Sequence, residues 1–454
     1  MQPTIGTLPP GSVNRQVVVL ALPMLGEQLL SYMVGLVDTL LAGHISKEAI
    51  AAVGTGSYLG WMINLTFALV GVGAAAIISR SVGARDEATT HRALHQGAIL
   101  GALLGFVACI ASYFAADSLA GFLTNTPSAR QLCAQFIRII APGYLLASFN
   151  MVGSAMLRAA GDTVTPLRIM AVVNVVNAAV SAALVFGGLT PQLGVTGIGI
   201  GFVTARSIGG ILMAVVLFNG VRGLRIRPSG LRVDWEMMKR VLRIGIPAAG
   251  DTMLMSIAQL TFVKIIAMTG TGDVGTANFA AHVVAVEVEG LSYMPALAWG
   301  TAAATLVGQY LGAGRPVEAT RAGHLAAMQG AALGLFSGAV FLAFAEQIYA
   351  MFTSDPAVRH VGIPAFRLMA FAQPFLCTAI VYIQALRGAG DTRMTMIFAL
   401  IGGIGLRIPI AYLGGVVLQG GLIGAWCGMW ADNLAKFLLG LARFLHGGWR
   451  RIRT

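Results

Sequence analysis

The sequence predicts an all-α membrane protein with twelve transmembrane helices arranged as two parallel six-helix repeats. Three observations predict it: the composition, a series of apolar runs of membrane-spanning length, and an internal repeat. Of the 454 residues, 57% are hydrophobic and 11% are charged, and the mean hydropathy is +0.79. Soluble domains carry about 25% charged residues. The lipid bilayer is therefore the solvent that suits this composition.

Twelve apolar runs follow one another, each of roughly the length that crosses a bilayer. Continuous apolarity over such lengths favours helices, because the strands of a membrane barrel alternate apolar and polar residues. The runs lie near 17–41, 51–79, 93–118, 132–157, 164–187, 194–219, 241–268, 278–307, 322–345, 361–386, 394–416 and 421–445.

Lys and Arg are unevenly divided between the two sets of connecting loops. The set that includes both termini and residues 220–243 holds 21 of them, and the opposite set holds five. Because Lys and Arg collect on the cytoplasmic side of a membrane, we expect a multi-pass protein of the cell (inner) membrane with both termini in the cytoplasm. The same rule explains the net charge of +12 without a nucleic-acid partner.

The two halves of the chain repeat one another. The segment LRAAGDT at 157–163 recurs as LRGAGDT at 386–392, an offset of 229 residues. Earlier in the chain the offset is 224, which pairs Glu27 with Asp251. An ordered series of matches at nearly constant offset is typical of internal duplication.

The repeat predicts how the chain is organised. We expect an N-terminal six-helix lobe (1–219), a basic cytoplasmic linker that is a solvated tether (220–243), and a C-terminal six-helix lobe (244–454). Because six spans return each half to its starting side, the two repeats are parallel. In transporters of this architecture the substrate site lies between the halves, and access alternates between the two sides of the membrane.

Charged residues within a span need a reason, because a charge at mid-bilayer costs about 2.5–3.5 kcal/mol. Asp38 follows Glu27 by eleven residues, close to three helical turns, so both acids project from one face of the first span. A carboxylate in an apolar cavity can exchange a proton or bind Na⁺ with neighbouring oxygens. A structural, hydrogen-bonded aspartate is the alternative. The fifth span adds a polar face that could hold a cation or a protonated Asp38, or simply join helices. Its members are Asn174, Asn177 and Ser181.

The second half offers its own polar residues. Glu289 shares a helical face with His282 and Tyr293, at spacings of seven and four residues. We expect Glu289 to recognise a cationic substrate, and the alternative is an ion pair with Arg407 or Lys264. The predicted substrate-binding residues are Glu289, Asp251, His282, Tyr293 and Tyr32.

Several motifs occur in a characteristic order. The first span carries Val37-Asp38-Thr39, and the eighth carries EGLSYMP at 289–295, followed by YLGAGRP at 310–316. Together with the two LR-x-AGDT segments, they resemble the prokaryotic branch of the multidrug and toxic compound extrusion (MATE) family. Ser181 departs from the pattern, since an aspartate stands there in many relatives of one subgroup.

The resemblance implies a secondary active transporter that exports organic cations and other drugs in exchange for H⁺ or Na⁺. It matches Asp38 to the first-span aspartate of the family, as the residue that takes the coupling ion. We expect no cofactor beyond that ion, and we expect a monomer. The sequence has no phosphate-cradling loop or nucleophile constellation, so we predict neither an enzyme nor an ATP-driven pump.

Two other transporter classes fit parts of the sequence. A flippase for lipid-linked precursors, from the same superfamily, would carry extra spans or a basic central cavity. A major facilitator transporter would carry Gly-x-x-x-Asp-Arg after its second span, where this chain reads SVGARD at 81–86.

Overall fold

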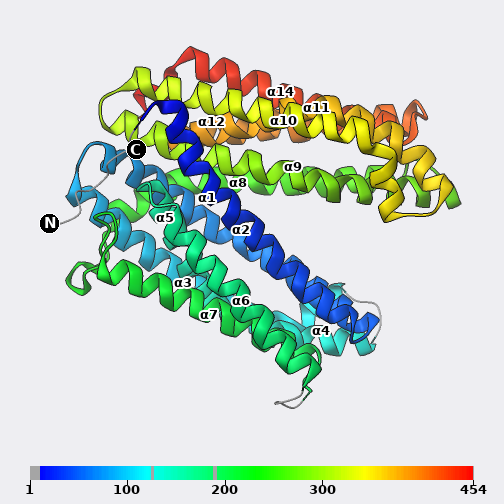
Figure 1. Cartoon of the computed structure of the whole chain (residues 1–454), viewed down its shortest axis with the longest axis horizontal. Coiled ribbons are helices and arrows are strands. Elements are labelled where there is room, and N and C mark those ends of the chain that lie inside the picture. The colour runs from blue at the N-terminus through cyan, green and yellow to red at the C-terminus, as the bar shows by residue number, and fades with distance from the viewer. Residues whose placement is uncertain (1–10, 124–126, 188–191, 453–454) are drawn as a thin grey trace. The chain divides into compact units, whose positions relative to one another are not determined.

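The computed structural model describes residues 11–123, 127–187 and 192–452, and the remaining parts of the predicted lobes lie outside this account. Regular structure within the described ranges is helical, apart from one isolated β-bridge between Val221 and Leu224. The predicted all-α class is therefore confirmed (Figure 1).

The described residues of the first half form seven α-helices, because the fourth predicted span is divided in two. A 55° bend separates α4 from α5 at Pro142, whose ring supplies no backbone N–H. The elements are α1 (Val13–Gly43), α2 (Lys47–Gly83), α3 (Glu87–Leu123), α4 (Pro127–Ile140), α5 (Gly143–Ala159), α6 (Val164–Phe186), α7 (Val195–Asn219) and the short 3₁₀ helix η1 (Pro228–Gly230).

The second half repeats this arrangement with one irregular span. The eleventh predicted span contains two stretches of π-helix, a rare form with widened turns, on either side of Pro409. The elements are α8 (Trp235–Ala267), α9 (Gly272–Gly312), α10 (Pro316–Phe352), α11 (Pro356–Gly388), α12 (Thr392–Ala399), η2 (Leu400–Arg407), α13 (Ile408–Tyr412), η3 (Leu413–Val417), α14 (Gly421–His446) and the 3₁₀ helix η4 (Gly448–Arg451).

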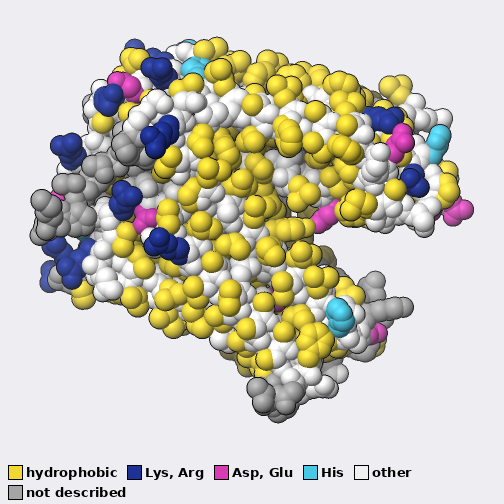
Figure 2. Space-filling model, viewed as in Figure 1, with side chains coloured by type: hydrophobic (Ala, Val, Ile, Leu, Met, Phe, Trp, Pro, Cys, Tyr) yellow, Lys and Arg dark blue, Asp and Glu magenta, His cyan; other side chains and the backbone are white. Residues whose placement is uncertain are grey.

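The described helices suit a membrane. Nine are long and apolar enough to cross a bilayer, and the bent pair α4–α5 makes a tenth candidate. The more polar α9 and α14 coincide with the two other predicted spans. Hydrophobic side chains cover the flanks of the helices in Figure 2, and Phe114 and Phe336 are 78% and 70% exposed. Such surfaces are stable in lipid but would associate in water.

The described residues pack into two compact units. Unit 1 contains residues 22–245, and unit 2 contains residues 11–21 and 246–452. Two helices are therefore shared: α1 begins in unit 2 and continues in unit 1, and α8 begins in unit 1 and continues in unit 2. Polar contacts anchor the start of α1 within unit 2, since Tyr310 donates a hydrogen bond to Gln16 Oε1 at 2.7 Å.

Glycines allow close packing at equivalent places in the two halves. Gly201 of α7 lies against Ser181 of α6, and Gly428 of α14 lies against the backbone of Arg407 and Ala411. A Cβ atom at either glycine would collide with these neighbours. The Gly-x-x-x-Gly spacing of both helices therefore brings the last two spans of each half together.

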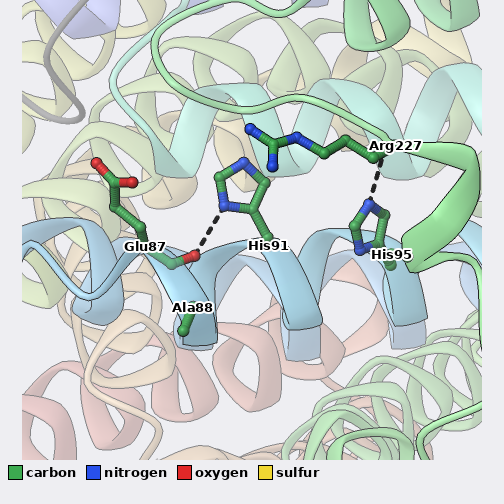
Figure 3. A pocket seen from close by; sticks show the side chains of 6 residues that line it. Glu87, Ala88, His91, His95 and Arg227 are labelled. Atoms are coloured by element: carbon green, nitrogen blue, oxygen red, sulfur yellow. Dashed lines mark hydrogen bonds between the residues drawn. The ribbon is translucent and has the colours of Figure 1, made fainter.

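The linker is not a free tether, contrary to our expectation. It turns back at Gly220, whose φ of +88° favours glycine, and then runs along α3. In Figure 3 the backbone N–H of Arg227 donates a hydrogen bond to Nε2 of His95, at 3.1 Å. The buried side chains of Leu224 and Ile226 hold the same segment. We call residues 220–234 the linker strap.

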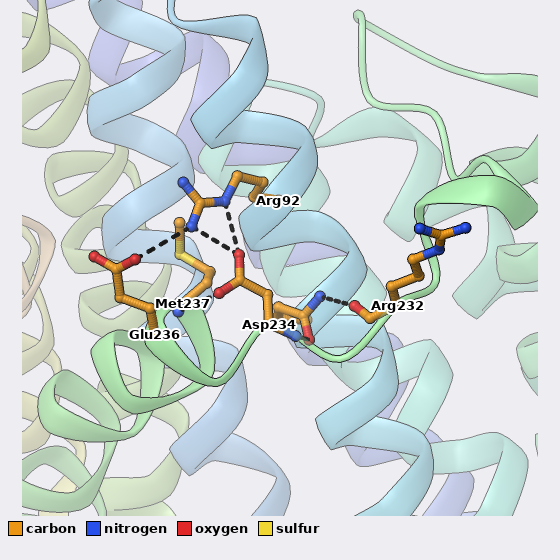
Figure 4. A network of polar contacts seen from close by, with 6 residues as sticks. Arg92, Arg232, Asp234, Glu236 and Met237 are labelled. Carbon is orange, nitrogen blue, oxygen red and sulfur yellow. Dashed lines mark hydrogen bonds and ion pairs between the residues drawn. The ribbon is translucent and has the colours of Figure 1, made fainter.

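The end of the linker strap is fixed at the start of α8. Asp234 forms a salt bridge of 2.7 Å with Arg92 of α3, as Figure 4 shows. Gln96 binds the backbone on either side of residue 233. Its amide N–H donates to the Arg232 carbonyl, and its amide oxygen accepts from the Asp234 N–H. The other oxygen of Asp234 accepts a hydrogen bond from the Met237 N–H, which caps α8. This bond, with help from Arg92, lowers the pKa of Asp234 below its usual value.

We predict that Asp234→Ala lowers the free energy of unfolding by about 1–2 kcal/mol, because it removes both a helix cap and a partly exposed ion pair. Asp234→Asn should retain most of the cap and lose only the ion pair. Glu236→Ala is the matched control, since Glu236 is 91% exposed and lies 3.7 Å from Arg92. Thermal unfolding of the purified protein measures all three.

The effect of Asp234→Asn also depends on pH. Because folding lowers the pKa of Asp234, the ionised carboxylate contributes stability above its unfolded pKa. That contribution disappears as the pH falls through the lowered, folded-state pKa. An Asp234→Asn variant that differs from the parent equally at neutral and strongly acidic pH would contradict this account.

Candidate functional site

Asp38 is the central residue of a polar cluster in unit 1. It lies in α1 and only 5% of its surface is exposed. Its Oδ1 accepts a hydrogen bond of 3.2 Å from the amide of Asn177 in α6. Asn177 itself is buried, and its own Oδ1 has no protein partner. Asp38 and Asn177 therefore meet at the contact between α1 and α6, and their predicted role in ion coupling stays a prediction.

A partly buried cation balances Asp38 from α7. Arg206 acts electrostatically on the Asp38 carboxylate, but no salt bridge joins the two side chains. The guanidinium group instead lies over the ring of Phe202, 5.3 Å from its centroid. The ring of Tyr144 in α5 lies beside that of Phe202, with 6.4 Å between the two ring centroids. Asp38 therefore has a nearby positive charge without being locked into an ion pair.

The other two polar residues of α6 have different partners. Asn174 donates hydrogen bonds to the backbone carbonyls of Leu30 and Met170, at 2.9 and 3.0 Å. It therefore joins α6 to α1 through the backbone. Ser181 is fully buried against Gly201, and its hydroxyl group has no protein partner. Of the predicted α6 face, only Asn177 contacts Asp38 directly.

Glu27 and Asp251, which the repeat pairs, form equivalent ion pairs. Glu27 contacts Arg158 at 2.6 Å within unit 1, and Asp251 contacts Arg387 at 2.6 Å within unit 2. Both arginines belong to the LR-x-AGDT segments. The pairs fasten the first helix of each half to the end of its fourth span. Each acid is thus held by a base, which distinguishes it from Asp38.

Glu289 belongs to a second cluster, in unit 2. It is partly buried in α9, and its Oε1 accepts a long hydrogen bond of 3.5 Å from the amide of Gln373 in α11. The Gln373 oxygen in turn lies 2.7 Å from the Ser292 hydroxyl. No salt bridge to Glu289 occurs within the described residues. Arg407 acts on it electrostatically, so the cluster resembles that of Asp38 in its charge pattern.

Arg407 makes its direct contacts elsewhere. It forms a salt bridge of 2.6 Å with Asp432 of α14 and donates a hydrogen bond of 2.8 Å to Gln259 of α8. Lys436, one turn beyond Asp432, contacts the same carboxylate at 2.9 Å. Asp432 is completely buried, and the two cations are 7% and 5% exposed. Two bases therefore share one acid inside unit 2.

The remaining predicted substrate residues differ in their surroundings. His282 is buried between the rings of Phe262 and Trp426, at 5.5 and 5.9 Å. Tyr293 packs against the small core around Cys377. Tyr32 is 41% exposed on α1. His282 thus has two aromatic neighbours, whereas Tyr293, one turn beyond Glu289 on α9, interacts with that carboxylate electrostatically.

Sequence reasoning missed Asp432 altogether, named Arg407 only as a possible ion-pair partner of Glu289, and gave no role to Arg206 or Lys436. One signal was present, because Asp432 and Lys436 are four residues apart and share a helical face. Lys264, for which we expected a carboxylate partner, is exposed near the end of α8. The long lysine side chain reaches a helix end from there. No cluster of three or more metal-ligating side chains occurs in the described ranges.

Comparison with known proteins bears on the whole chain. Residues 23–183 and 251–413 both match the MatE family, one match in each half. The probable multidrug resistance protein NorM of Thermotoga maritima is 30% identical over 447 residues, which cover 97% of this chain and 94% of the relative. The multidrug resistance protein PmpM of Pseudomonas aeruginosa is 26% identical over 401 residues, which cover 88% of this chain and 83% of the relative.

Solved structures share the fold. The crystal structure of a MATE protein in the bent conformation superposes with a TM-score of 0.88 at 23% identity, covering 96% of each chain. A multidrug resistance MATE family transporter in an outward-facing conformation gives the same TM-score and identity. The sequence matches in both halves, which rule out the major facilitator alternative, show that this chain is a multi-pass membrane transporter of the MATE family.

Proposed function

We propose that this transporter exports cationic, amphipathic drugs across the cell (inner) membrane, in exchange for H⁺ or Na⁺, by alternating access. The positions of Lys and Arg support an orientation with both termini in the cytoplasm. The names of the NorM and PmpM relatives support drugs as the substrate class. We further propose that it acts as a monomer.

The observation that carries the ion-coupling proposal is the state of Asp38. It is a buried acid that accepts one amide hydrogen bond and has a cation within electrostatic range, yet forms no salt bridge. A proton or a sodium ion can therefore bind it without first displacing a base. The unpartnered oxygens of Asn177 and Ser181 are available to solvate a sodium ion or the protonated acid.

Glu289 is the proposed recognition residue for the cationic substrate in unit 2. It too is an interior acid without a direct basic partner among the described residues, and the hydrogen bond that it accepts from Gln373 is long. Glu27 and Asp251, which we also predicted as functional, would act through their ion pairs with Arg158 and Arg387. Breaking either pair would leave an uncompensated interior charge, which is strongly destabilising.

Dye efflux from proteoliposomes tests the proposed function. The protein is reconstituted into proteoliposomes, and the vesicles are loaded with ethidium. A pH gradient or a Na⁺ gradient is then imposed across the membrane in separate experiments. We expect one gradient to drive export against the dye gradient and the other to have little effect, which names the coupling ion. Export that requires neither gradient would contradict ion coupling.

We predict that Asp38→Asn abolishes gradient-driven efflux, reducing its rate at least tenfold, because the amide cannot exchange a proton or neutralise Na⁺. The matched control is Asp117→Asn, which removes an exposed acid of the same unit that pairs with Arg138 at the surface. The control should transport at the parental rate. Parental efflux by Asp38→Asn under the driving gradient would eliminate Asp38 as the coupling residue.

We predict that Glu289→Gln weakens binding of tetraphenylphosphonium about tenfold or more, because the variant loses the charge that attracts the cation. Glu287→Gln is the matched control. It removes an acid two residues away that points to a different side of α9 and is exposed. Isothermal titration of the purified protein measures both affinities, and equal weakening in the two variants would argue against a specific role of Glu289.

A further inference from the structure

A cavity of about 380 Å³ lies between the start of α3 and the linker strap, entirely within unit 1. Its volume is within the range of small-molecule sites, about 300–1,000 Å³. We call it the strap pocket, and Figure 3 shows it from close by. The residues that line it are Glu87, Ala88, His91, His95, Arg227 and Gly230. None of them belongs to the polar clusters around Asp38 and Glu289.

The strap pocket lies at the level of the membrane surface. Glu87 and His91 come just before the apolar run of α3, which begins near residue 93. The end of the linker strap exposes Leu231 and Val233, at 41% and 54%, and Trp235 at the start of α8 is 70% exposed. Exposed apolar side chains suit contact with lipid, and tryptophan is enriched where membrane meets water. The pocket therefore opens at the depth of phospholipid head groups.

Hydrogen bonds fix the walls of the pocket and the state of its imidazoles. Nε2 of His95 accepts from the Arg227 N–H, so the strap is held against this ring. A Cβ atom at Gly230 would collide with the same ring. Nδ1 of His91 lies 2.8 Å from the Glu87 carbonyl oxygen, which can only accept, so Nδ1 carries the hydrogen. Nε2 of neutral His91 is therefore a hydrogen-bond acceptor.

Two opposite charges line the strap pocket without neutralising one another. Glu87 and Arg227 are both exposed, and within the described residues neither side chain forms a salt bridge. In Figure 3 the carboxylate of Glu87 and the guanidinium group of Arg227 stand apart from one another. Glu87 would repel a simple anion, and Arg227 would repel a simple cation. A zwitterion satisfies both, with its negative group at Arg227 and its positive group at Glu87.

The lining residues select a phosphate and a primary ammonium group. Arginine binds phosphate oxygens through two parallel N–H groups. An ammonium group can donate hydrogen bonds to the Glu87 carboxylate and to Nε2 of His91, whereas a quaternary ammonium group has no N–H to donate. Quaternary ammonium groups are recognised by the faces of Trp, Tyr or Phe, and the residues that line the strap pocket include none of these. The pocket therefore suits an ethanolamine head group better than a choline head group.

We propose that the strap pocket binds the head group of an ethanolamine phospholipid, with the phosphate at Arg227 and the ammonium group at Glu87 and His91. Basic pockets at the ends of membrane helices are known to hold lipid head groups. A bound lipid would connect the linker strap to α3, since Arg227 belongs to one and Glu87 to the other. Neither the coupling ion nor the exported drug takes part, so the site stands or falls separately from the proposed transport function.

Native mass spectrometry of the delipidated full chain in detergent tests the site. Dioleoyl phospholipids with ethanolamine, choline and glycerol head groups are titrated separately, and the dissociation constant of the first bound lipid is measured. We expect the ethanolamine lipid to bind about fivefold more tightly than either of the others, which is the upper end of the effect of a partly exposed charge pair. Equal affinities for the three lipids would overturn the proposal.

Two variants divide the head group into its parts. Arg227→Gln should weaken binding of the ethanolamine and glycerol lipids alike, about fivefold. Glu87→Gln should weaken binding of the ethanolamine lipid and strengthen that of the anionic glycerol lipid, so the preference between them disappears. The matched controls are Arg232→Gln and Glu236→Gln, which remove nearby exposed charges that do not line the pocket. Both controls should bind all three lipids as the parent protein does.

Inorganic phosphate, added as a soluble competitor, distinguishes a lipid site from a site for free phosphate. We expect it to leave the bound ethanolamine lipid in place, and release of the lipid by millimolar phosphate would assign the pocket to the free anion instead. A preference for the ethanolamine lipid that persists in both Arg227→Gln and Glu87→Gln would place the lipid elsewhere on the protein and overturn the proposal.

Discussion

A charge placed in the apolar interior of a membrane protein has to be compensated close by, and much of this transporter follows from that constraint. Water cannot screen such a charge, so a neighbouring side chain must do so. Each unit holds an acid that is compensated by direct contact, Glu27 or Asp251. Each also holds an acid that a base balances without touching it, Asp38 or Glu289. The first kind holds helices together, and the second kind comprises the acids to which we assign ion coupling and cation recognition in our proposal.

The two halves share their scaffold more closely than their chemistry. The ion pairs of Glu27 and Asp251 occupy equivalent positions, as do the glycines that bring the last two spans of each half together. The base that acts on the second acid from a distance does not occupy equivalent positions in the two halves. For Asp38 it is Arg206 on α7, and for Glu289 it is Arg407 at the end of a π-helical stretch. Duplication preserved the contacts that set helix packing, and the polar interiors diverged.

The helices and their duplication could be predicted from the sequence, because the patterns that indicate them are local or repeat along the chain. Apolar runs indicated the helices. Helical spacing placed Asn177 on the polar face of the fifth span, and its amide does donate a hydrogen bond to Asp38, while the ion-coupling roles of both residues stay predictions. Spacing alone did not choose between the two readings of Asn174, a cation ligand or a join between helices, because a shared helical face does not say which neighbour that face contacts. Asn174 binds the backbone of α1, and His282 packs between two aromatic rings. The contact between Arg407 and Asp432 joins separate spans, and nothing in the sequence pairs them.

In the first helix of each repeat, the need to compensate an interior charge also determines where the helix is held. Both α1 and α8 pass from one unit to the other, and the change falls at 21–22 and at 245–246. A proline follows directly in each case, Pro23 or Pro247, where one backbone hydrogen bond of the helix is missing and bending is easier. Four residues later stands the acid of the ion pair, Glu27 or Asp251. Because that acid must stay with its arginine to remain neutralised, the helix beyond the proline is bound to one unit while its start is anchored in the other. Pro23 and Pro247 therefore stand between the anchored start of each helix and the acid that holds the rest of it, and Asp38 follows the first of these prolines along α1.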